Sequence, residues 1–249
     1  MTVNVILQAR MSSTRLPGKV LKPILGKAML THQIERLKEA KLIDKIIVAT
    51  SDDASDNDIE VLCKSIKIKC FRGSLHDVLA RYYHASISYP SDHIVRITGD
   101  CPVIDPEIVD KVISLHLTTK ADYTSNCTHP TFPDGLDTEV FTFSALEQAF
   151  KNATSPEERE HVTPYLYHEN TKNVCRELRH PDNLSHLRWT VDQPEDFTLI
   201  ETIYKNLYPK NPKFRFCDIL TLINTQPQLS EINHQYVLEP QPLKPINKG

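Results

Sequence analysis

The chain has 249 residues, of which 40% are hydrophobic and 24% charged, enough for one large α/β domain with a well-buried core. The net charge is −3, and no apolar run approaches the roughly 20 residues needed to cross a bilayer. The chain begins with a strand-like segment in place of a signal peptide. We therefore expect a cytoplasmic protein that binds neither nucleic acid nor membrane. Six scattered cysteines without a C-x-x-C pair favour neither a zinc site nor a disulfide framework.

Strand-like and helix-like patterns alternate over the first 120 residues. Strands are predicted at 3–7, 45–50, 67–71 and 93–98, and helices at 29–37, 59–66 and 78–87. A further helix begins at Pro106, with Asp105 as its cap. This alternation indicates an α/β fold with a doubly wound, mostly parallel sheet, in which ligands bind beyond the carboxyl ends of the strands.

The pattern changes from about residue 121, where segments rich in Thr and Pro begin. A strand is predicted at 137–143, with helices at 144–152 and 157–167, so residues from about 125 to 170 form an insertion over the site. The sheet resumes with a strand at 187–191, followed by helices from about Glu195 and Cys217. We therefore expect a single domain over residues 1–233 and a loose, proline-containing tail over 234–249.

The loop after the first strand is strongly basic. The first acidic residue of the chain is Glu35, and five cations precede it, namely Arg10, Arg15, Lys19, Lys22 and Lys27. A Walker A loop is excluded, because Ser13 and Val20 stand where that motif needs Gly and Ser or Thr. Solvated basic loops are often only solubilising. A basic loop after a buried strand is nevertheless typical of phosphate binding in α/β proteins.

Two aspartates stand where predicted strands end. Asp100 follows the strand at 93–98 through one glycine, and Asp192 directly follows the strand at 187–191. Each is close to a proline, so each could instead cap a turn or helix. As a pair at one edge of the sheet, they are candidate ligands of Mg²⁺, which takes one or two carboxylates and keeps several waters.

The motifs together resemble a known family. Residues 8–19 (QARMSSTRLPGK) closely resemble the nucleotide-binding signature of the cytidylyltransferases that activate acidic sugars, typified by the CMP-ketodeoxyoctonate and CMP-sialic acid synthetases. Further motifs are similar to the spore-coat-polysaccharide branch of that superfamily, and lie at 49–52 (ATSD), 71–74 (FRGS), 77–83 (DVLARYY), 98–102 (TGDCP), 134–141 (DGLDTEVF), 157–164 (EEREHVTP) and 187–197 (LRWTVDQPEDF).

The resemblance implies a Rossmann-like nucleotidyltransferase fold, related to GT-A folds, and Mg²⁺-dependent transfer of CMP from CTP to a sugar with release of pyrophosphate. Asp100 and Asp192 would hold Mg²⁺ and act in catalysis with Arg10 and Lys19. The implied nucleotide-binding residues are Ala9, Arg10, Ser13, Arg15, Lys19, Ser51, Asp52, Arg72 and Gly99. For Ser51 and Asp52 helix capping is an equal alternative, and Asp77 and Arg81 could simply pair with one another.

The implied acceptor site lies in the insertion and the last strand. Its residues are Asp137, Glu139, Arg159, His161 and Arg188. An acidic keto sugar carries a carboxylate, for which Arg159 or Arg188 would be the bidentate partner, whereas His161 alone is as readily structural. We also expect a homodimer, because the insertion carries several aromatic residues that a monomer would expose. A glycosyltransferase and a non-catalytic CTP-binding paralogue stay open as alternatives.

Overall fold

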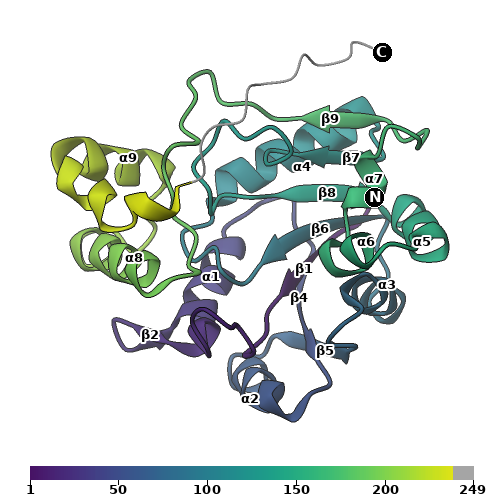
Figure 1. Ribbon diagram of the computed structural model, residues 1–249, viewed down its shortest axis with the longest axis horizontal. Helices are drawn as coiled ribbons and strands as arrows, with labels where there is room; N and C mark the ends of the chain where they lie inside the picture. Colours follow the sequence, from purple (N-terminus) through teal and green to yellow (C-terminus); the bar gives the residue numbers. More distant parts are fainter. Residues whose placement is uncertain (238–249) are drawn as a thin grey trace.

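A seven-stranded sheet forms the centre of the computed structural model, which describes residues 1–237 (Figure 1). The strands run in the order β5 (Lys69–Gly73), β4 (Lys45–Ser51), β1 (Val3–Gln8), β6 (His93–Thr98), β8 (Glu139–Thr142), β7 (Tyr123–Ser125) and β9 (Cys175–Glu177). The first four are parallel, β8 is antiparallel to both β6 and β7, and β9 is parallel to β7. The predicted α/β fold with a mostly parallel sheet is thus confirmed.

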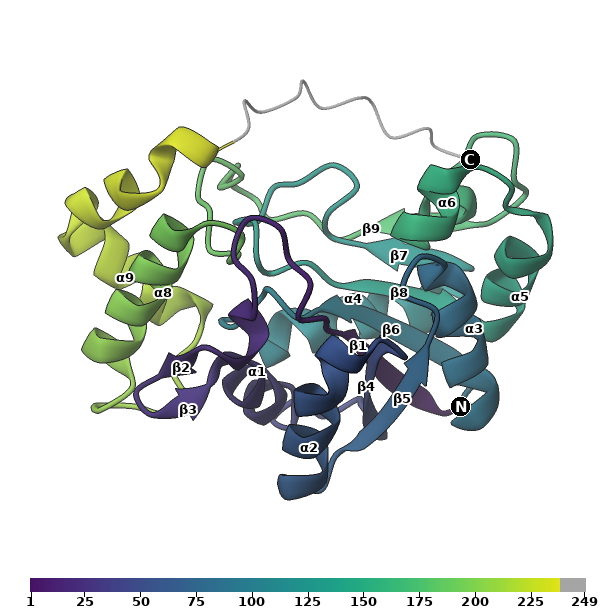
Figure 2. The same ribbon diagram turned by 60° about the horizontal axis from the view of Figure 1, so that its bottom comes forward.

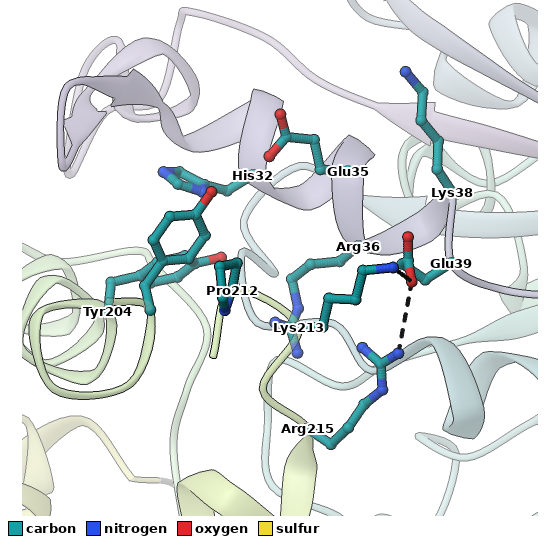
Figure 3. Close-up of a pocket in the computed structure, with 10 residues that line it drawn as sticks. His32, Glu35, Arg36, Lys38, Glu39, Tyr204, Pro212, Lys213 and Arg215 are labelled. Carbon is teal, nitrogen blue, oxygen red and sulfur yellow. Dashed lines mark hydrogen bonds and ion pairs between the residues drawn. The ribbon is translucent and has the colours of Figure 1, made fainter. Parts of the chain in front are cut away.

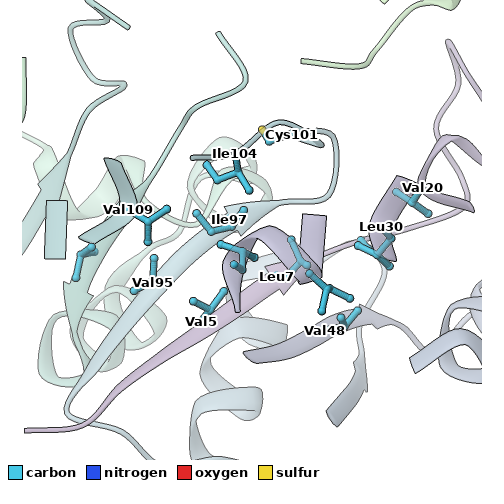
Figure 4. Packing of buried hydrophobic residues seen from close by; sticks show 14 of the residues in the cluster. Val5, Leu7, Val20, Leu30, Val48, Val95, Ile97, Cys101, Ile104 and Val109 are labelled. Carbon is cyan, nitrogen blue, oxygen red and sulfur yellow. The ribbon is translucent and has the colours of Figure 1, made fainter. Parts of the chain in front are cut away.

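Helices cover both faces of the sheet because alternate strand residues point to opposite sides. From β1, Val3, Val5 and Leu7 pack with α1 (Met29–Leu37), α2 (Asn57–Ser65) and α4 (Pro106–Thr119), in the cluster of Figure 4. Ile6 faces the other way, toward α3 (Val78–Ser88) and α5 (Phe143–Asn152). Asp105 accepts hydrogen bonds from the backbone N–H groups of Glu107 and Ile108, which confirms the predicted cap of α4.

A third apolar cluster joins the C-terminal helices to the segment at 187–191 and to the first residues of α1 and α4. Trp189 is 1% exposed there, packed with α8 (Pro194–Leu207) and α9 (Phe216–Thr225). Short 3-10 helices follow at η3 (Pro227–Ile232) and η4 (His234–Tyr236), so the predicted tail begins with an ordered turn. Its remainder, residues 238–249, lies outside the described residues. Among residues 1–237, none of the helices has the length and apolar character to cross a bilayer.

The insertion contains more elements than the sequence predicts. After α5 it has two short helices, α6 (Pro156–His161) and α7 (Pro164–Tyr167), so the prediction of one helix over 157–167 is wrong. The break falls at Val162, which has a φ of 70° and cannot continue a helix. Strands β7 and β9 were not predicted, because three residues are too few to show alternation.

The aromatic residues of the insertion mostly pack inside their own chain. Phe141 is fully buried and Phe132 is 7% exposed, whereas Tyr167 is 41% exposed. The expectation that a monomer would expose this aromatic surface is therefore wrong for the larger part of it. The homodimer stays a prediction.

The segment at 187–191, which the sequence predicts to be a strand, does not pair as a regular strand of the sheet. Only Arg188 forms a bridge, to Asp134, and the backbone N–H of Trp189 donates to the Asp134 carbonyl at 2.6 Å. Gly135, which follows Asp134, has a φ of 107° and packs directly against the backbone of the 187–191 segment. A Cβ atom on Gly135 would come within 2.5 Å of the Thr190 backbone nitrogen. The extended segment still delivers Asp192 to the carboxyl edge of the sheet. The strand predicted at 67–71 begins two residues later, at Lys69, because Lys67 has a φ of 59°.

A buried histidine pair makes the stability of the fold dependent on pH. His116 is fully buried. Its Nε2 shares a hydrogen bond with His93 Nδ1 at 3.0 Å, and its Nδ1 lies 3.0 Å from the Thr124 hydroxyl. Burial, and then the neighbouring His93, lower the pKa of His116 to about 4. In the unfolded chain this histidine has the ordinary pKa of about 6.5. Below that pH the unfolded chain therefore binds more protons than the folded one, so acid destabilises the fold.

We expect the free energy of unfolding to fall by up to about 3 kcal/mol as the pH drops from about 6.5 to about 4 because of this histidine. Urea unfolding across that range would measure it. In His116→Gln the free energy of unfolding should depend less steeply on pH. In His76→Gln, which changes an exposed histidine, the dependence on pH should equal that of the parent. An unchanged slope in His116→Gln would assign the pH dependence to other groups.

Candidate active site

The basic loop after β1 is held in place by a buried carboxylate. The backbone N–H of Met11 donates to Asp56 Oδ1 at 2.7 Å, and Gly18, with a φ of 69°, closes the loop by donating to the Met11 carbonyl at 3.0 Å. Asp56, the last residue of η2 (Ala54–Asp56), also accepts from the Thr50 hydroxyl and from the backbone and hydroxyl of Ser51. Burial alone would raise the pKa of Asp56, but these hydrogen bonds hold it below its ordinary value.

Asp56→Ala should lower the free energy of unfolding by about 3 kcal/mol, because it leaves the Met11 and Ser51 N–H groups without an acceptor. It should also weaken nucleotide binding by loosening the loop. Urea unfolding measures the first effect. Asp58→Ala, an exposed carboxylate in the first turn of α2, is the matched control and should stay within about 0.5 kcal/mol of the parent. Equal effects of both changes would contradict the anchoring role.

The loop delivers Lys19 to the two aspartates. Lys19 begins η1 (Lys19–Leu21), is 8% exposed, and its Nζ lies 3.2 Å from Asp100 Oδ2 and 2.8 Å from Asp192 Oδ1. The same ammonium donates to the Val191 carbonyl at 2.7 Å. Neither aspartate side chain caps a helix, since Asp105 caps α4 and Asp196 accepts from the N–H groups at the start of α8. The capping alternative for Asp100 and Asp192 is thus wrong.

Asp192 lies among three cations. Besides Lys19, the Arg15 guanidinium is 3.0 Å and the Arg188 guanidinium 3.3 Å from its Oδ2. Burial alone would raise the pKa of Asp192, yet these three cations hold it below its ordinary value. Arg188 also pairs with Asp196 at 2.9 Å and with Asp134 at 2.7 Å. The last segment of the site is therefore a dense network of charged groups with Arg188 at its centre.

A cavity of about 240 Å³ opens above this lysine at the carboxyl edge of the sheet. In Figure 2 the dark purple loop after β1 rises beside α8, and this loop forms one wall. Gly99 lies at the floor, where a Cβ atom would come within 2.9 Å of the Gln8 carbonyl. The structure brings most of the predicted nucleotide-binding residues together around the cavity, whose lining includes Ala9, Arg10, Ser13, Arg15, Lys19, Gly99, Asp100 and Asp192.

The remaining predicted nucleotide residues lie beside the cavity, at the ends of β4 and β5. Ser51 is buried and its hydroxyl donates to Asp56, so helix capping, the alternative for this residue, is wrong. Asp52 is exposed, and its backbone N–H donates to the Gly73 carbonyl at 2.8 Å. Arg72 donates to the carbonyls of Ser51 and Asp53, at 2.9 and 2.7 Å. Arg72 therefore shapes the loop after β4, and its contact with a nucleotide stays a prediction.

Three acidic residues of the insertion, Asp134, Asp137 and Glu139, lie outside the cavity lining. Glu139 on β8 is buried, pairs with Arg96 and accepts from the Tyr123 hydroxyl at 2.7 Å. Burial raises the pKa of Asp137 well above its ordinary value, and neighbouring carboxylates add to the effect. Burial likewise raises the pKa of Asp134 to about 6, against the attraction of Arg188 and with repulsion from the other aspartates.

Arg159 and His161, on α6, are separate from the cavity lining. Arg159 forms an ion pair with Asp77 and donates to the Phe150 carbonyl at 2.9 Å. The suggested pair of Asp77 with Arg81 is therefore wrong. The Arg81 guanidinium instead donates to the Ser74 carbonyl at 3.0 Å. His161 is exposed, and its part in acceptor binding stays a prediction, as does that of Arg159.

A second cavity, of about 290 Å³, lies between α1 and the start of α9 and contains none of the predicted site residues (Figure 3). Several of its charged groups contact one another or the backbone. Lys213 Nζ lies 2.7 Å from Glu39 Oε2, and Arg36 Nε donates to the Ile104 carbonyl at 2.7 Å. The first contact joins the loop before α9 to the residues after α1, and the second joins α1 to the loop before α4, so we assign this cavity a structural role.

Sequence reasoning missed three residues that organise the site, namely Asp56, Asp134 and Asp196. Asp56 holds the basic loop, and the other two bind Arg188 beside Asp192. Both partners of Arg188 stand in the quoted motifs, at 134–141 and 187–197, and Asp196 has the third helical position of a capping box. A search for acids able to neutralise Arg188 would have found those two. Asp56 gives no such signal, because its partners are backbone and hydroxyl groups.

Comparison with known proteins agrees with this geometry. The family described as Cytidylyltransferase matches residues 4–213. The spore coat polysaccharide biosynthesis protein SpsF of Bacillus subtilis is 31% identical over 89% of this chain and 94% of its own. A 3-deoxy-manno-octulosonate cytidylyltransferase of Chlamydia trachomatis is 29% identical over 66% of each chain. A solved cytidylyltransferase from Leptospira borgpetersenii has a TM-score of 0.88 and 34% identity, covering 92% of this chain and 97% of that one. The chain therefore belongs to the cytidylyltransferase family of nucleotidyltransferases.

Proposed function

We propose that the protein is a Mg²⁺-dependent cytidylyltransferase that transfers CMP from CTP to a sugar hydroxyl and releases pyrophosphate, in the biosynthesis of a surface polysaccharide or glycan. The observation that carries this proposal is the position of Lys19. Its ammonium lies between Asp100 and Asp192, in a cavity whose wall carries Arg10 and Arg15. A cavity with cations on one wall and paired carboxylates at its edge suits a polyphosphate and the cation that accompanies it.

The residues present fit Mg²⁺. Asp100 Oδ2 and Asp192 Oδ1 are both within 3.2 Å of one point, the Lys19 Nζ atom, so two carboxylate oxygens already converge on a cation. Carboxylate oxygens are the hard ligands that Mg²⁺ takes, usually one or two of them with several waters. Asp100 and Asp192 would hold the ion, which when bound would neutralise phosphate charge and favour a deprotonated acceptor oxygen.

The protein side chains contribute position and charge. The acceptor oxygen forms a bond to the α-phosphorus of CTP, the bond from that phosphorus to the leaving pyrophosphate oxygen breaks, and the hydroxyl proton leaves to solvent. Arginine binds phosphate oxygens in a bidentate manner, which suits the exposed Arg10 and Arg15. Lysine is a compact charge, which suits Lys19 for the group whose charge grows as pyrophosphate leaves.

The acceptor we propose is an acidic keto sugar, because 3-deoxy-manno-octulosonate, named in one relative, is of that class. The chain's own residues place conditions on it. Arg188 already pairs with three carboxylates and Arg159 with Asp77, so either arginine must exchange a partner to bind the sugar carboxylate. Arg10 and Arg15 are the more exposed cations near the cavity.

The test is pyrophosphate release from CTP and Mg²⁺ with 3-deoxy-manno-octulosonate, a sialic acid and a neutral hexose as acceptors. We expect release with an acidic sugar, its loss when EDTA is added, and lower rates when UTP or ATP replaces CTP. CTP binding without release for any acceptor would indicate a non-catalytic paralogue. Sugar transfer from a ready-made CMP-sugar, without use of CTP, would indicate a glycosyltransferase.

A further inference from the structure

The Lys19 ammonium has all three of its hydrogens matched by acceptors in the free protein. Its Nζ lies 2.7 Å from the Val191 carbonyl, 2.8 Å from Asp192 Oδ1 and 3.2 Å from Asp100 Oδ2. An ammonium has three donors and no acceptor, so this arrangement satisfies it completely. No phosphate is needed to hold the lysine where it lies.

The lysine is also the main neutralising charge for Asp100. Among residues 1–237, Lys19 is the cation within ion-pair distance of Asp100, whereas Asp192 contacts Arg15 and Arg188 as well. The ammonium therefore balances a carboxylate that, in the described part of the chain, has no second cation within ion-pair distance.

A divalent cation shared by the same two oxygens would have to displace this ammonium. The carboxylate oxygens of Asp100 and Asp192 that would hold Mg²⁺ are the same two that now accept from the Lys19 ammonium, so the two cations would compete for them. Two cations cannot lie together at these oxygens, since their repulsion at a few ångströms amounts to several kcal/mol even in a polar environment. The flexible four-carbon stem of lysine allows the charge to move away once another anion accepts it.

We propose that Lys19 is a resident counter-ion that keeps divalent metal out of the free site, so that metal enters only when nucleotide phosphates draw the lysine off Asp100 and Asp192. This inference rests on the proposed function. It adds an order of events, in which nucleotide binding precedes or accompanies metal binding, and makes Lys19 the residue that sets that order.

The test titrates the nucleotide-free protein with Mn²⁺, a paramagnetic substitute for Mg²⁺, and follows free Mn²⁺ by electron paramagnetic resonance. We expect weak binding to the parent protein and binding at least about tenfold tighter in Lys19→Met, which removes the charge and keeps the length of the side chain. Lys22→Met is the matched control. It changes a lysine of the same loop whose ammonium lies 4.7 Å from the Phe197 ring, away from the aspartates, and should bind Mn²⁺ like the parent.

The double variant Lys19→Met, Asp100→Asn should lose the Mn²⁺ affinity that Lys19→Met gains. This loss would show that the carboxylates bind the Mn²⁺. Tight Mn²⁺ binding by the parent protein without nucleotide would overturn the proposal, and this result needs no variant to fold. Equal affinities in the parent and in a folded Lys19→Met protein would also overturn it. Failure of the proposed function gives a different result, namely absence of pyrophosphate release, because the Mn²⁺ titration uses neither CTP nor acceptor.

Discussion

Lys19→Ala should lower the turnover number by about 10² or more while leaving the protein folded. The ammonium is placed to reach the phosphates of a nucleotide in the cavity, and charge stabilisation of a transition state is worth several kcal/mol. Steady-state pyrophosphate release at saturating CTP measures the effect. The fold should survive because Arg15 and Arg188 still neutralise Asp192.

The control for this change is Lys22→Ala, in the same loop. Its turnover should stay within about twofold of the parent, because the Lys22 ammonium packs over the Phe197 ring and is not part of the cavity lining. Thermal unfolding of both variants separates loss of chemistry from loss of structure. Near-normal turnover in Lys19→Ala would remove the lysine from the catalytic group and leave it only the role of a counter-ion.

The second large effect is expected from the aspartates. Asp100→Asn and Asp192→Asn should each abolish Mg²⁺-dependent turnover, because an amide lacks the charge that holds a divalent ion. CTP binding, measured by calorimetry without metal, should weaken far less, since in the proposed function the basic loop would supply the contacts to the triphosphate. For Asp192→Asn it could even strengthen, as Arg15 would be released from its ion pair.

Glu107→Gln is a matched control at the same edge of the fold, because Glu107 is exposed in the first turn of α4 and is not part of the cavity lining. Its turnover should equal that of the parent. Full activity of either asparagine variant at limiting Mg²⁺ would exclude that aspartate as a ligand.

The fold was predictable from the sequence where single residues carry strong local rules. The apolar runs of β1, β4 and β6 are bounded by polar residues and could only be buried strands, and Asp105 with Pro106 marks the start of α4. The short strands β7 and β9 could not be found, because their existence depends on pairing with residues distant in the chain. The segment at 187–191 has strand-like composition and lacks a neighbour that would complete its ladder.

The candidate site was also predictable only in part. The basic loop and the two aspartates follow strand ends, which meet at one edge of a parallel sheet, so the sequence could place them at the same edge. It did not predict that Lys19 forms an ion pair with Asp100. The assignments on α6 were weaker, because no rule of sequence says which way a surface helix of an insertion faces. Arg159 turns toward Asp77, and the paired state of Arg188 depends on the packing of three separate segments.

The close approach at Gly135 has a consequence for engineering new acceptor specificity. The insertion meets the segment that carries Asp192 through backbone atoms, with Asp134 and Trp189 hydrogen-bonded across a gap that has no room for a Cβ atom. Side chains pack around this contact as well, since Phe132 and Leu136 share an apolar cluster with Leu187 and Trp189. A segment transplanted from another family member would therefore have to bring apolar partners that fit this cluster. It would also have to keep a glycine at position 135, because any Cβ atom there would push the segment that carries Asp192 away from the insertion.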